Sequence, residues 1–331
     1  ANLTSRVVEN LFWLGRYSER FDNSARMLRV ALSRVVEAGG AKTPAVASAM
    51  ELALLLGILP KPEEDEPVVE GSDHVLLEAI YDPKQPGSLA GNIRSLMWSA
   101  THVRERLSLD HWHSLNRLQR ELQAALKTHP TLTEAIAFLD RVLGVSSSLT
   151  GFAMDNMTRD DGWRFLIIGR RLERLSFLAN AIGNFLRMPS ARGPGSLEWL
   201  LELADSIITY RSRYSRLPEL LPVIDLLVFD DSNPHGVVFQ GSVLARYLDR
   251  MGRELGDHSE SSLPDVLGRL RAFSLEPLEH LQFSECRTCP PCEELADLLK
   301  ELDAAAVQLS ARLGMRYFTH VGDVSRQTMA L

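Results

Sequence analysis

The sequence lacks several features that mark particular classes of protein. Its longest apolar stretch, around Leu52 to Leu59, is far too short to span a membrane. Basic residues are not in excess: 36 Lys and Arg against 43 Asp and Glu give a net charge of −7, which argues against a general nucleic-acid binder. The first residues lack the apolar segment and cleavage site of a signal peptide. We therefore expect a cytoplasmic protein that binds neither nucleic acid nor a membrane.

Common catalytic and cofactor motifs are also missing from the sequence. It contains neither of the glycine-rich nucleotide loops, G-x-x-x-x-G-K-[ST] or G-x-G-x-x-G. It has no G-x-S-x-G nucleophile elbow and no Glu-x-x-His pair of the kind that holds two metal ions in helical bundles. The residues alone therefore identify no reaction.

The hydrophobic pattern that is present is helical almost throughout. Apolar residues from Val7 to Val35 recur mostly at steps of three and four, which is the seam of a long amphipathic helix. No alternating apolar pattern continues beyond four or five residues, so we predict no strands. The sequence predicts an all-α chain with further helices at about 43–59, 72–81, 87–107, 109–127, 131–156, 159–188, 196–214, 217–228, 235–255, 263–282 and 291–318.

Loops and an internal repeat divide the chain. Polar segments rich in Pro or Gly predict loops at 60–72, 188–196 and 256–264. The segments Leu11–Arg20 and Phe165–Arg174 match and share Gly-Arg-x-x-Glu-Arg; a second match, at similar spacing, relates residues 77–107 to residues 226–255. A chain of 331 residues is long for one core. We expect two repeated halves, 1–150 and 151–331, packed as one compact, pseudo-symmetric multi-helix bundle.

Charged residues of the repeat lie on an unexpected side of their helices. At about 100° per residue, those of the first copy fall opposite the apolar seam. They are flanked there by further apolar residues, which predicts helices buried on two sides. Charges buried in such a place must be paired, because an unpaired one costs several kcal/mol. The polar residues concerned are Arg16, Glu19, Arg20 and Asn23, and then Arg170, Glu173, Arg174 and Asn180.

Each copy carries two guanidinium groups and one carboxylate. One arginine of each copy can pair with the glutamate, which leaves the other free to bind a carboxylate or phosphate. Glu19 and Glu173 are the candidate catalytic residues, and the arginines with Asn23 are candidate ligand-binding residues. Internal Arg–Glu pairs can equally serve only to fix the register of a bundle. Gly15 and Gly169, inside helices despite a cost of about 1 kcal/mol, favour close approach by another helix.

Two further polar groups are candidates for a site. The segment around residues 205–214 holds the candidate ligand-binding residues Asp205, Tyr210, Arg211 and Arg213, although tyrosines beside arginines also occur at packed helix interfaces. Arg159 is a candidate at the start of the second motif helix. Its neighbour Asp160 is expected to cap that helix.

All three cysteines lie in one short run, Cys286-x-x-Cys289-x-x-Cys292. This spacing is compatible with an Fe–S or Zn site, for which His280 or His320 could serve as a fourth ligand. Structural thiols and a redox disulfide are the alternatives. No other cofactor is predicted.

At the two Gly-Arg-x-x-Glu-Arg segments the chain resembles the alpha-E family, all-helical proteins named for a Glu-Arg motif. Two places depart from the usual family pattern: His235-Gly236 stand where Arg-Ser is usual, and Asn92-Ile93-Arg94 replaces an Asn-Ala-Arg context. The resemblance covers nearly the whole chain and is carried, beyond the repeat, by Ser5–Tyr17, Asn23–Leu28, Arg104–Asn116, Met157–Phe165, Asp205–Tyr214, Asn233–Gln240 and Tyr317-Phe318.

The resemblance implies a genetic context and a class of chemistry. Members occur beside, or fused to, a circularly permuted ATP-grasp ligase, often with a transglutaminase-like protein and sometimes a proteasome-related peptidase. The implied role is formation or processing of an amide bond on an amino acid or peptide. One hypothesis is a partner of the ligase whose arginines bind an anionic amino-acid or peptide intermediate. The alternatives are an enzyme that uses Glu19 or Glu173 as general base for acyl or amide transfer, and a purely structural interaction bundle.

Overall fold

A computed structural model describes residues 4–62, 72–214, 217–255, 261–286 and 289–318. Within these ranges the chain forms thirteen α-helices and no β-strand, which confirms the predicted all-α class. The predicted loops at 60–72 and 256–264 fall partly on residues 63–71 and 256–260, which lie outside the described residues.

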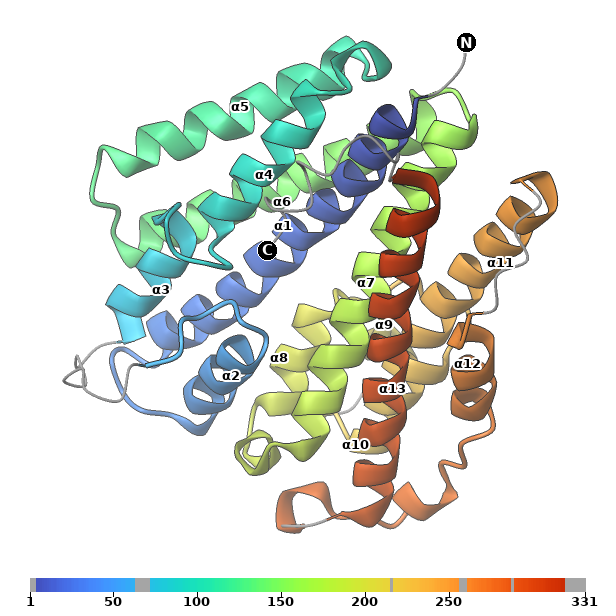
Figure 1. Ribbon diagram of the computed structural model, residues 1–331. Coiled ribbons are helices and arrows are strands. Elements are labelled where there is room, and N and C mark those ends of the chain that lie inside the picture. The colour runs from blue at the N-terminus through green and yellow to red at the C-terminus, as the bar shows by residue number, and fades with distance from the viewer. Residues whose placement is uncertain (1–3, 63–71, 215–216, 256–260, 287–288, 319–331) are drawn as a thin grey trace.

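Two long helices in the middle of the molecule carry the two copies of the motif (Figure 1). They are α1 (Ser5–Glu37) and α7 (Asp161–Arg187). Asp160 caps the N-terminus of α7: its carboxylate accepts a hydrogen bond from the Trp163 backbone N–H at 3.0 Å, so the predicted capping role is confirmed. Arg106 donates to both carboxylate oxygens of Asp160 and ties this cap to the first half of the chain.

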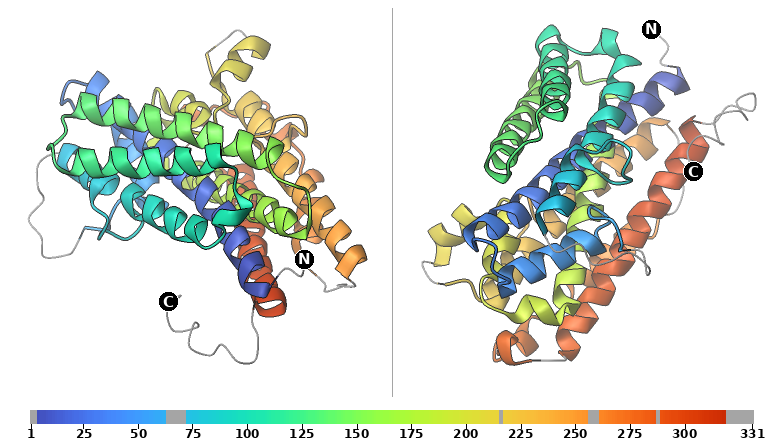
Figure 2. Two further views of the ribbon diagram at one scale, coloured as in Figure 1. Left: turned by 90° about the horizontal axis from the view of Figure 1, so that it is seen from above. Right: turned by 90° about the vertical axis from the view of Figure 1, so that its left-hand side faces the viewer.

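The other helices surround this central pair. The α1 helix packs against α4 and α6, and α7 packs against α11 and α13. Helices α3 to α6 lie on one side of α1, and α11 to α13 lie beyond α7 (Figure 1), while α5 and α6 run side by side (Figure 2). The bounds are α2 Pro44–Leu55, α3 Ser72–Tyr81, α4 Leu89–Thr101, α5 Leu109–Leu126, α6 Leu132–Asp155, α8 Ser196–Leu203, α9 Ile207–Tyr214, α10 Leu220–Ile224, α11 Val237–Leu255, α12 Leu263–Arg271 and α13 Pro290–Leu313.

Buried apolar side chains from both halves of the sequence belong to one continuous cluster. Phe12 of α1, for example, has its ring 5.3 Å from that of Phe318 near the end of the described chain. Burial of this kind supplies most of the free energy of folding. The duplication of residues 1–150 in 151–331 stays a prediction.

The structure corrects three predicted helices. The predicted helix 196–214 is two helices, α8 and α9, because the backbone turns at Asp205, which has a φ of 48°. The predicted helix 263–282 ends at Arg271, and 87–107 ends as an α-helix at Thr101. None of these breaks carries a Gly or Pro at the turning residue, so the usual sequence signal is missing.

By length and composition, α6 is the one helix in the described ranges that meets the requirement for a membrane span. It packs along α1 and α5, and its buried side chains include Phe138, Leu139 and Val142. An apolar helix covered on two sides in this way is also what the core of a helical bundle contains.

Candidate functional site

The backbones of helices α1 and α7 are in contact at one glycine of each helix, Gly15 and Gly169. A Cβ atom added to Gly15 would overlap the backbone carbonyl oxygen of Leu166, and one added to Gly169 would overlap that of Phe12. Only glycine allows two helix backbones to come so close. The predicted close helix packing at these glycines is confirmed. It brings the following turn of each helix, which carries the charged residues, against the other helix.

Across this contact, Glu173 of α7 is bound by two arginines of α1. The Nε of Arg16 donates to Oε2 of Glu173 at 2.7 Å. Arg20 forms a two-pronged contact, with Nε 2.7 Å from Oε1 and Nη2 3.2 Å from Oε2. Each oxygen of this carboxylate therefore accepts hydrogen bonds from guanidinium groups of the opposite helix.

Glu19 of α1 is bound in the same way by two arginines of α7. Arg174 makes the two-pronged contact, with Nη2 2.7 Å from Oε1 and Nε 3.2 Å from Oε2. The Nη2 of Arg170 lies 3.3 Å from Oε1. The prediction that one arginine pairs with the glutamate of its own copy and leaves the other free is therefore wrong, since both arginines of each copy bind the glutamate of the opposite helix. Because the two helix backbones are in contact, the facing carboxylate is the one within reach. We call these two glutamates and four arginines the Arg/Glu cluster.

Both carboxylates of the cluster are buried and ionised. Burial alone would raise the pKa of Glu19, but the charges of Arg174 and Arg170 outweigh it and hold the pKa below its ordinary value. Burial and the Arg16 and Arg20 guanidinium groups act on Glu173 in the same way, and its pKa is also lowered. Four guanidinium groups against two carboxylates leave a formal excess of two positive charges.

The cluster is also tied to the surrounding helices. Arg16 donates to Ser310 of α13 at 2.6 Å, and its guanidinium carbon lies 4.9 Å from the Trp13 ring centroid. Arg170 donates to Thr150 of α6 at 2.9 Å. A fifth arginine, Arg171, lies close to these positive charges. Burial and the charges of Arg174 and Arg170 lower the pKa of Arg171 to about 10. Reasoning from the sequence missed Arg171, which occupies a variable position inside the repeated motif, where the first copy has Tyr17.

The α11 side of the cluster is occupied by the chain itself. Arg174 lies 3.5 Å from the backbone oxygen of Pro234. Asp205, at its strained turn, approaches both His235 (3.6 Å) and Arg26 (3.5 Å). Burial and the Arg174 charge lower the pKa of His235, against the opposing effect of Asp205. The structure therefore brings the predicted residue Asp205 to the edge of the cluster.

The opposite side of the cluster opens into a pocket of about 270 Å³. Arg20 lies at this pocket with 35% of its side chain exposed, against 17% for its counterpart Arg174. Both bonded nitrogens of Arg20 go to Glu173, and in the described part of the chain its Nη1 has no hydrogen-bond partner. We call this hollow the Arg20 pocket; it is lined by Arg20, Asn23, Ser24, Leu56, Gly57, Ile58, Gly87, Asn92, Glu173, Ser176, Phe177 and Asn180.

Four predicted site residues make their contacts elsewhere. Arg159 donates to the backbone oxygen of Met154 at 3.0 Å, next to the α7 cap. The buried Tyr210 accepts the backbone N–H of Glu219 at 3.1 Å. Arg213 pairs with Asp230, and Arg211 is exposed to solvent. The structure does not bring these four side chains into contact with the Arg/Glu cluster.

A buried histidine adjoins the cluster on the α6 side. His111 of α5 and Arg170 line the same small cavity, of about 10 Å³, and neither ring nitrogen of His111 has a hydrogen-bond partner in the described ranges. Burial and the Arg170 charge lower the pKa of His111 to about 4. The folded protein therefore holds this imidazole neutral at physiological pH.

The cysteine run lies at the start of α13. Cys289 and Cys292 are buried and Cys286 is partly exposed, and the backbone N–H of Cys292 lies 3.3 Å from Sγ of Cys289. Burial raises the pKa of the Cys292 thiol, and a side-chain hydrogen bond between the thiols of Cys292 and Cys289 acts in the same direction. Within the described ranges, no three His, Cys, Asp or Glu side chains are placed to hold a metal ion. His320 lies outside the described residues. The Fe–S or Zn site stays a prediction, which metal analysis of protein purified without oxygen would test.

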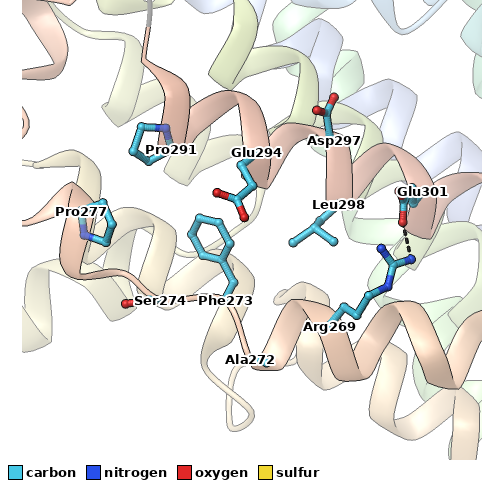
Figure 3. A pocket seen from close by; sticks show the side chains of 10 residues that line it. All are labelled: Arg269, Ala272, Phe273, Ser274, Pro277, Pro291, Glu294, Asp297, Leu298 and Glu301. Atoms are coloured by element: carbon cyan, nitrogen blue, oxygen red, sulfur yellow. Dashed lines mark hydrogen bonds and ion pairs between the residues drawn. The ribbon is translucent and has the colours of Figure 1, made fainter.

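A larger hollow of about 490 Å³ lies between α12 and α13. Figure 3 shows the Glu294 carboxylate pointing toward the Phe273 ring and Arg269 joined to Glu301. None of the predicted site residues lines it. With Glu294, Asp297 and Glu301 on its wall, its charge is unsuited to an anionic ligand.

Comparison with known proteins places the chain among uncharacterized relatives. It matches the Alpha-E family, described as a predicted alpha-helical domain with a conserved ER motif, over residues 3–318. Uncharacterized proteins of Mycobacterium bovis and of two Mycobacterium tuberculosis strains are each 30% identical to it over 331 residues. These alignments cover 91% of this chain but 35% of each relative, so the chain spans about a third of their length. No solved structure matches it. The family match over nearly the whole chain confirms the resemblance, and the chain belongs to the Alpha-E family.

Proposed function

We propose that this chain is the ligand-binding helical component of a system that forms amide or peptide bonds with an ATP-grasp ligase. It binds an anionic amino-acid or peptide intermediate at the Arg/Glu cluster. A transglutaminase-like protein is a further partner of the same system. The observation that carries the proposal is the Arg20 pocket: a hollow of about 270 Å³ into which a buried, positively charged cluster presents a guanidinium group with a free edge.

The charge of the cluster supports an anionic ligand. Arg20 is held in place by its two bonds to Glu173, so little side-chain entropy is lost when a ligand binds. Its Nη1 still has donors to offer, and a guanidinium group matches the geometry of a carboxylate. The formal excess of two positive charges favours an anion in the pocket over a neutral molecule.

The surroundings of the glutamates favour binding over general-base catalysis by Glu19 or Glu173. Each carboxylate already accepts hydrogen bonds from two guanidinium groups, and its pKa is lowered. A general base works best with a pKa near the operating pH, which is usually achieved by raising the pKa of a carboxylate. The pKa values of Glu19 and Glu173 are lowered instead. Their role in this proposal is to fix the arginines.

The lengths of the relatives support a role within a larger system. The curated relatives are about three times as long as the segment that matches this chain. A helical unit that recurs as one part of a longer protein is suited to handing a ligand to a neighbouring catalytic unit. In this proposal that unit is the ligase, and the transferred ligand is the amino-acid or peptide intermediate.

Calorimetric titration tests the proposal. The probes are L-glutamate, L-aspartate, a Glu-Glu dipeptide, inorganic phosphate and ATP. We expect the carboxylate probes to bind the wild-type chain and Arg20→Gln to weaken them at least tenfold, since a charge-assisted hydrogen bond contributes about 1.5–3 kcal/mol. Arg94→Gln, at an exposed arginine of α4, is the matched control and should bind as the wild type does.

The partnership with the ligase has its own measurement. Adding the chain to the ligase should change the rate or the product of amide-bond formation, and Arg20→Gln should remove that change. The proposal fails if no anionic probe binds, or if Arg20→Gln binds every probe as tightly as the wild type. The proposed partnership with the ligase fails if adding the chain changes neither the rate nor the product of amide-bond formation.

A further inference from the structure

A second polar pair lies in the Arg20 pocket beside the arginine. The Nδ2 of Asn92 on α4 donates to Oγ of Ser24 on α1 at 2.9 Å. Both side chains are deeply buried, with 9% of Asn92 and 4% of Ser24 exposed. Both also line the pocket. The pocket therefore contains buried hydrogen-bonding groups besides the arginine.

This pair has hydrogen-bonding capacity left over. In the described ranges Oδ1 of Asn92 accepts no hydrogen bond, and the Ser24 hydroxyl donates none. The second N–H of Asn92 Nδ2 is a further free donor within these ranges. If the two ends of the Asn92 amide are exchanged, Ser24 donates to Asn92 instead, and the pair still keeps free donors, on the amide nitrogen, and a free acceptor, the Ser24 oxygen. Because both side chains line the pocket, these free groups are accessible to a ligand that enters it.

The free groups select among ligands. An amide offers an N–H and a C=O together, and so satisfies both members of the pair. A carboxylate offers only acceptors and would face the Asn92 oxygen unfavourably. An ammonium group offers only donors and leaves the Ser24 hydroxyl unpaired. The pair is thus complementary to an amide rather than to either end of a free amino acid.

The position of the pair relates it to the arginine. Ser24 follows Arg20 by four residues on α1, so the two side chains lie on one face of the helix, with their Cβ atoms about 5–6 Å apart. On α7, Nδ2 of Asn184 donates to Oδ1 of Asn180 at 2.7 Å, which leaves the Asn180 amide nitrogen as a further donor at the pocket. Because Arg20, Ser24 and Asn92 all line one pocket of about 270 Å³, one small ligand can reach the arginine and the pair at once.

We propose that the Arg20 pocket recognises a small molecule that carries a carboxylate and an amide close together, as an N-acyl amino acid or a dipeptide does. Arg20 binds the carboxylate, and Asn92 with Ser24 binds the amide. This inference rests on the proposed function and narrows its ligand to a compound whose amide bond is already formed. The reaction that supplies it is an ATP-dependent amide ligation.

A pair of matched probes tests the recognition of the amide. N-acetyl-L-alanine and O-acetyl-L-lactate have the same shape and the same carboxylate, but the ester has an oxygen in place of the amide N–H. We expect the wild-type chain to bind the amide about tenfold more tightly. In Asn92→Leu the two probes should bind within about twofold of each other, because the amide loses its partner. Ser24→Ala is a smaller change at the same pair and should also reduce the difference in affinity between the amide and the ester.

The control variant is Arg94→Gln, at an exposed residue of α4 that does not line the pocket, and it should keep the preference. Equal binding of both probes to the wild type, with both weakened by Arg20→Gln, would overturn amide recognition and leave the proposed anion binding standing. A preference that persists in both Asn92→Leu and Ser24→Ala would also overturn it. Binding of neither probe would overturn this inference, and the anion titration would then decide whether the proposed function falls with it.

Discussion

Gly15 of α1 and Gly169 of α7 each lie against the backbone of the other's helix, and the Arg/Glu cluster follows directly from this contact. Each glycine is followed by an arginine, and four positions after each glycine comes the glutamate that the opposite helix binds. The glycines therefore set the distance over which the charges meet.

Replacing Gly15 by alanine should destabilise the fold strongly. The added methyl group would overlap backbone atoms of α7, which cannot move aside as a flexible side chain can. We expect a loss of about 3 kcal/mol or more in the free energy of unfolding, at or above the upper end of the usual cost of overpacking. Urea denaturation measures it. Gly144→Ala on α6 is the matched control: no atom lies within 4 Å of its new Cβ, so it should be neutral or stabilising by up to about 1 kcal/mol.

Replacing Glu19 by glutamine should also destabilise the protein, through charge rather than volume. The change leaves the guanidinium groups of Arg170 and Arg174 buried without a carboxylate. Breaking a buried ion pair from one side costs about 3–5 kcal/mol. Glu301→Gln removes the exposed partner of Arg269 and should cost far less, because solvent screens an exposed ion pair. Similar losses in the two variants would mean that the cluster is solvated.

The two cluster glutamates should make the protein sensitive to acid. Their pKa values are lowered in the folded state, so their stabilisation is complete above the ordinary value of 4.5. It is lost as the pH falls below 4.5 toward the lowered folded-state values, because the unfolded chain takes up protons first. If the midpoint of unfolding is measured at a series of pH values from 6 to 3, it should therefore decrease once the pH is below about 4.5. The Glu19→Gln, Glu173→Gln double variant should show a smaller decrease in the same pH range.

The effect of His111 on the stability of the fold should appear at higher pH than the effect of the two glutamates. Its pKa falls from the ordinary 6.5 to about 4 on folding, so the unfolded chain binds a proton that the folded chain excludes. Stability is then complete above pH 6.5 and declines between pH 6.5 and 4, by up to about 3 kcal/mol for a shift of this size. His111→Phe should remove this decline, whereas His113→Phe, at an exposed position on the same helix, should keep it. Denaturation at pH 7 and pH 4.5 distinguishes the two variants.

The helical fold and the existence of a buried cluster follow from the sequence. The apolar seams predict the helices, and the second apolar face around Arg16 and Arg170 predicts that the charges are enclosed. The glycines of the motif predict the close contact. These conclusions need only periodicity within one helix, which a single sequence contains.

The partners across the helix contact could not be predicted in this way. Spacings of three and four residues allow Glu19 to pair with Arg16 of its own helix, and only the crossing of α1 and α7 decides that it binds Arg170 and Arg174 instead. The Arg20 pocket depends in the same way on Asn92, which α4 brings to α1. The break at Asp205 is a local helix cap: the backbone N–H of Ser206 donates to Leu201 and that of Asp205 to Glu202, and Asp205 takes the left-handed conformation that glycine usually adopts there, so the usual sequence signal is missing.

A crystal structure of the chain soaked with N-acetyl-L-alanine is the sharpest test of ligand recognition by the Arg20 pocket. We expect the ligand in the Arg20 pocket, with its carboxylate within hydrogen-bond distance of Nη1 of Arg20 and its amide at Ser24 and Asn92. A ligand bound instead beside Arg174 and His235, or in the acidic hollow between α12 and α13, would contradict it.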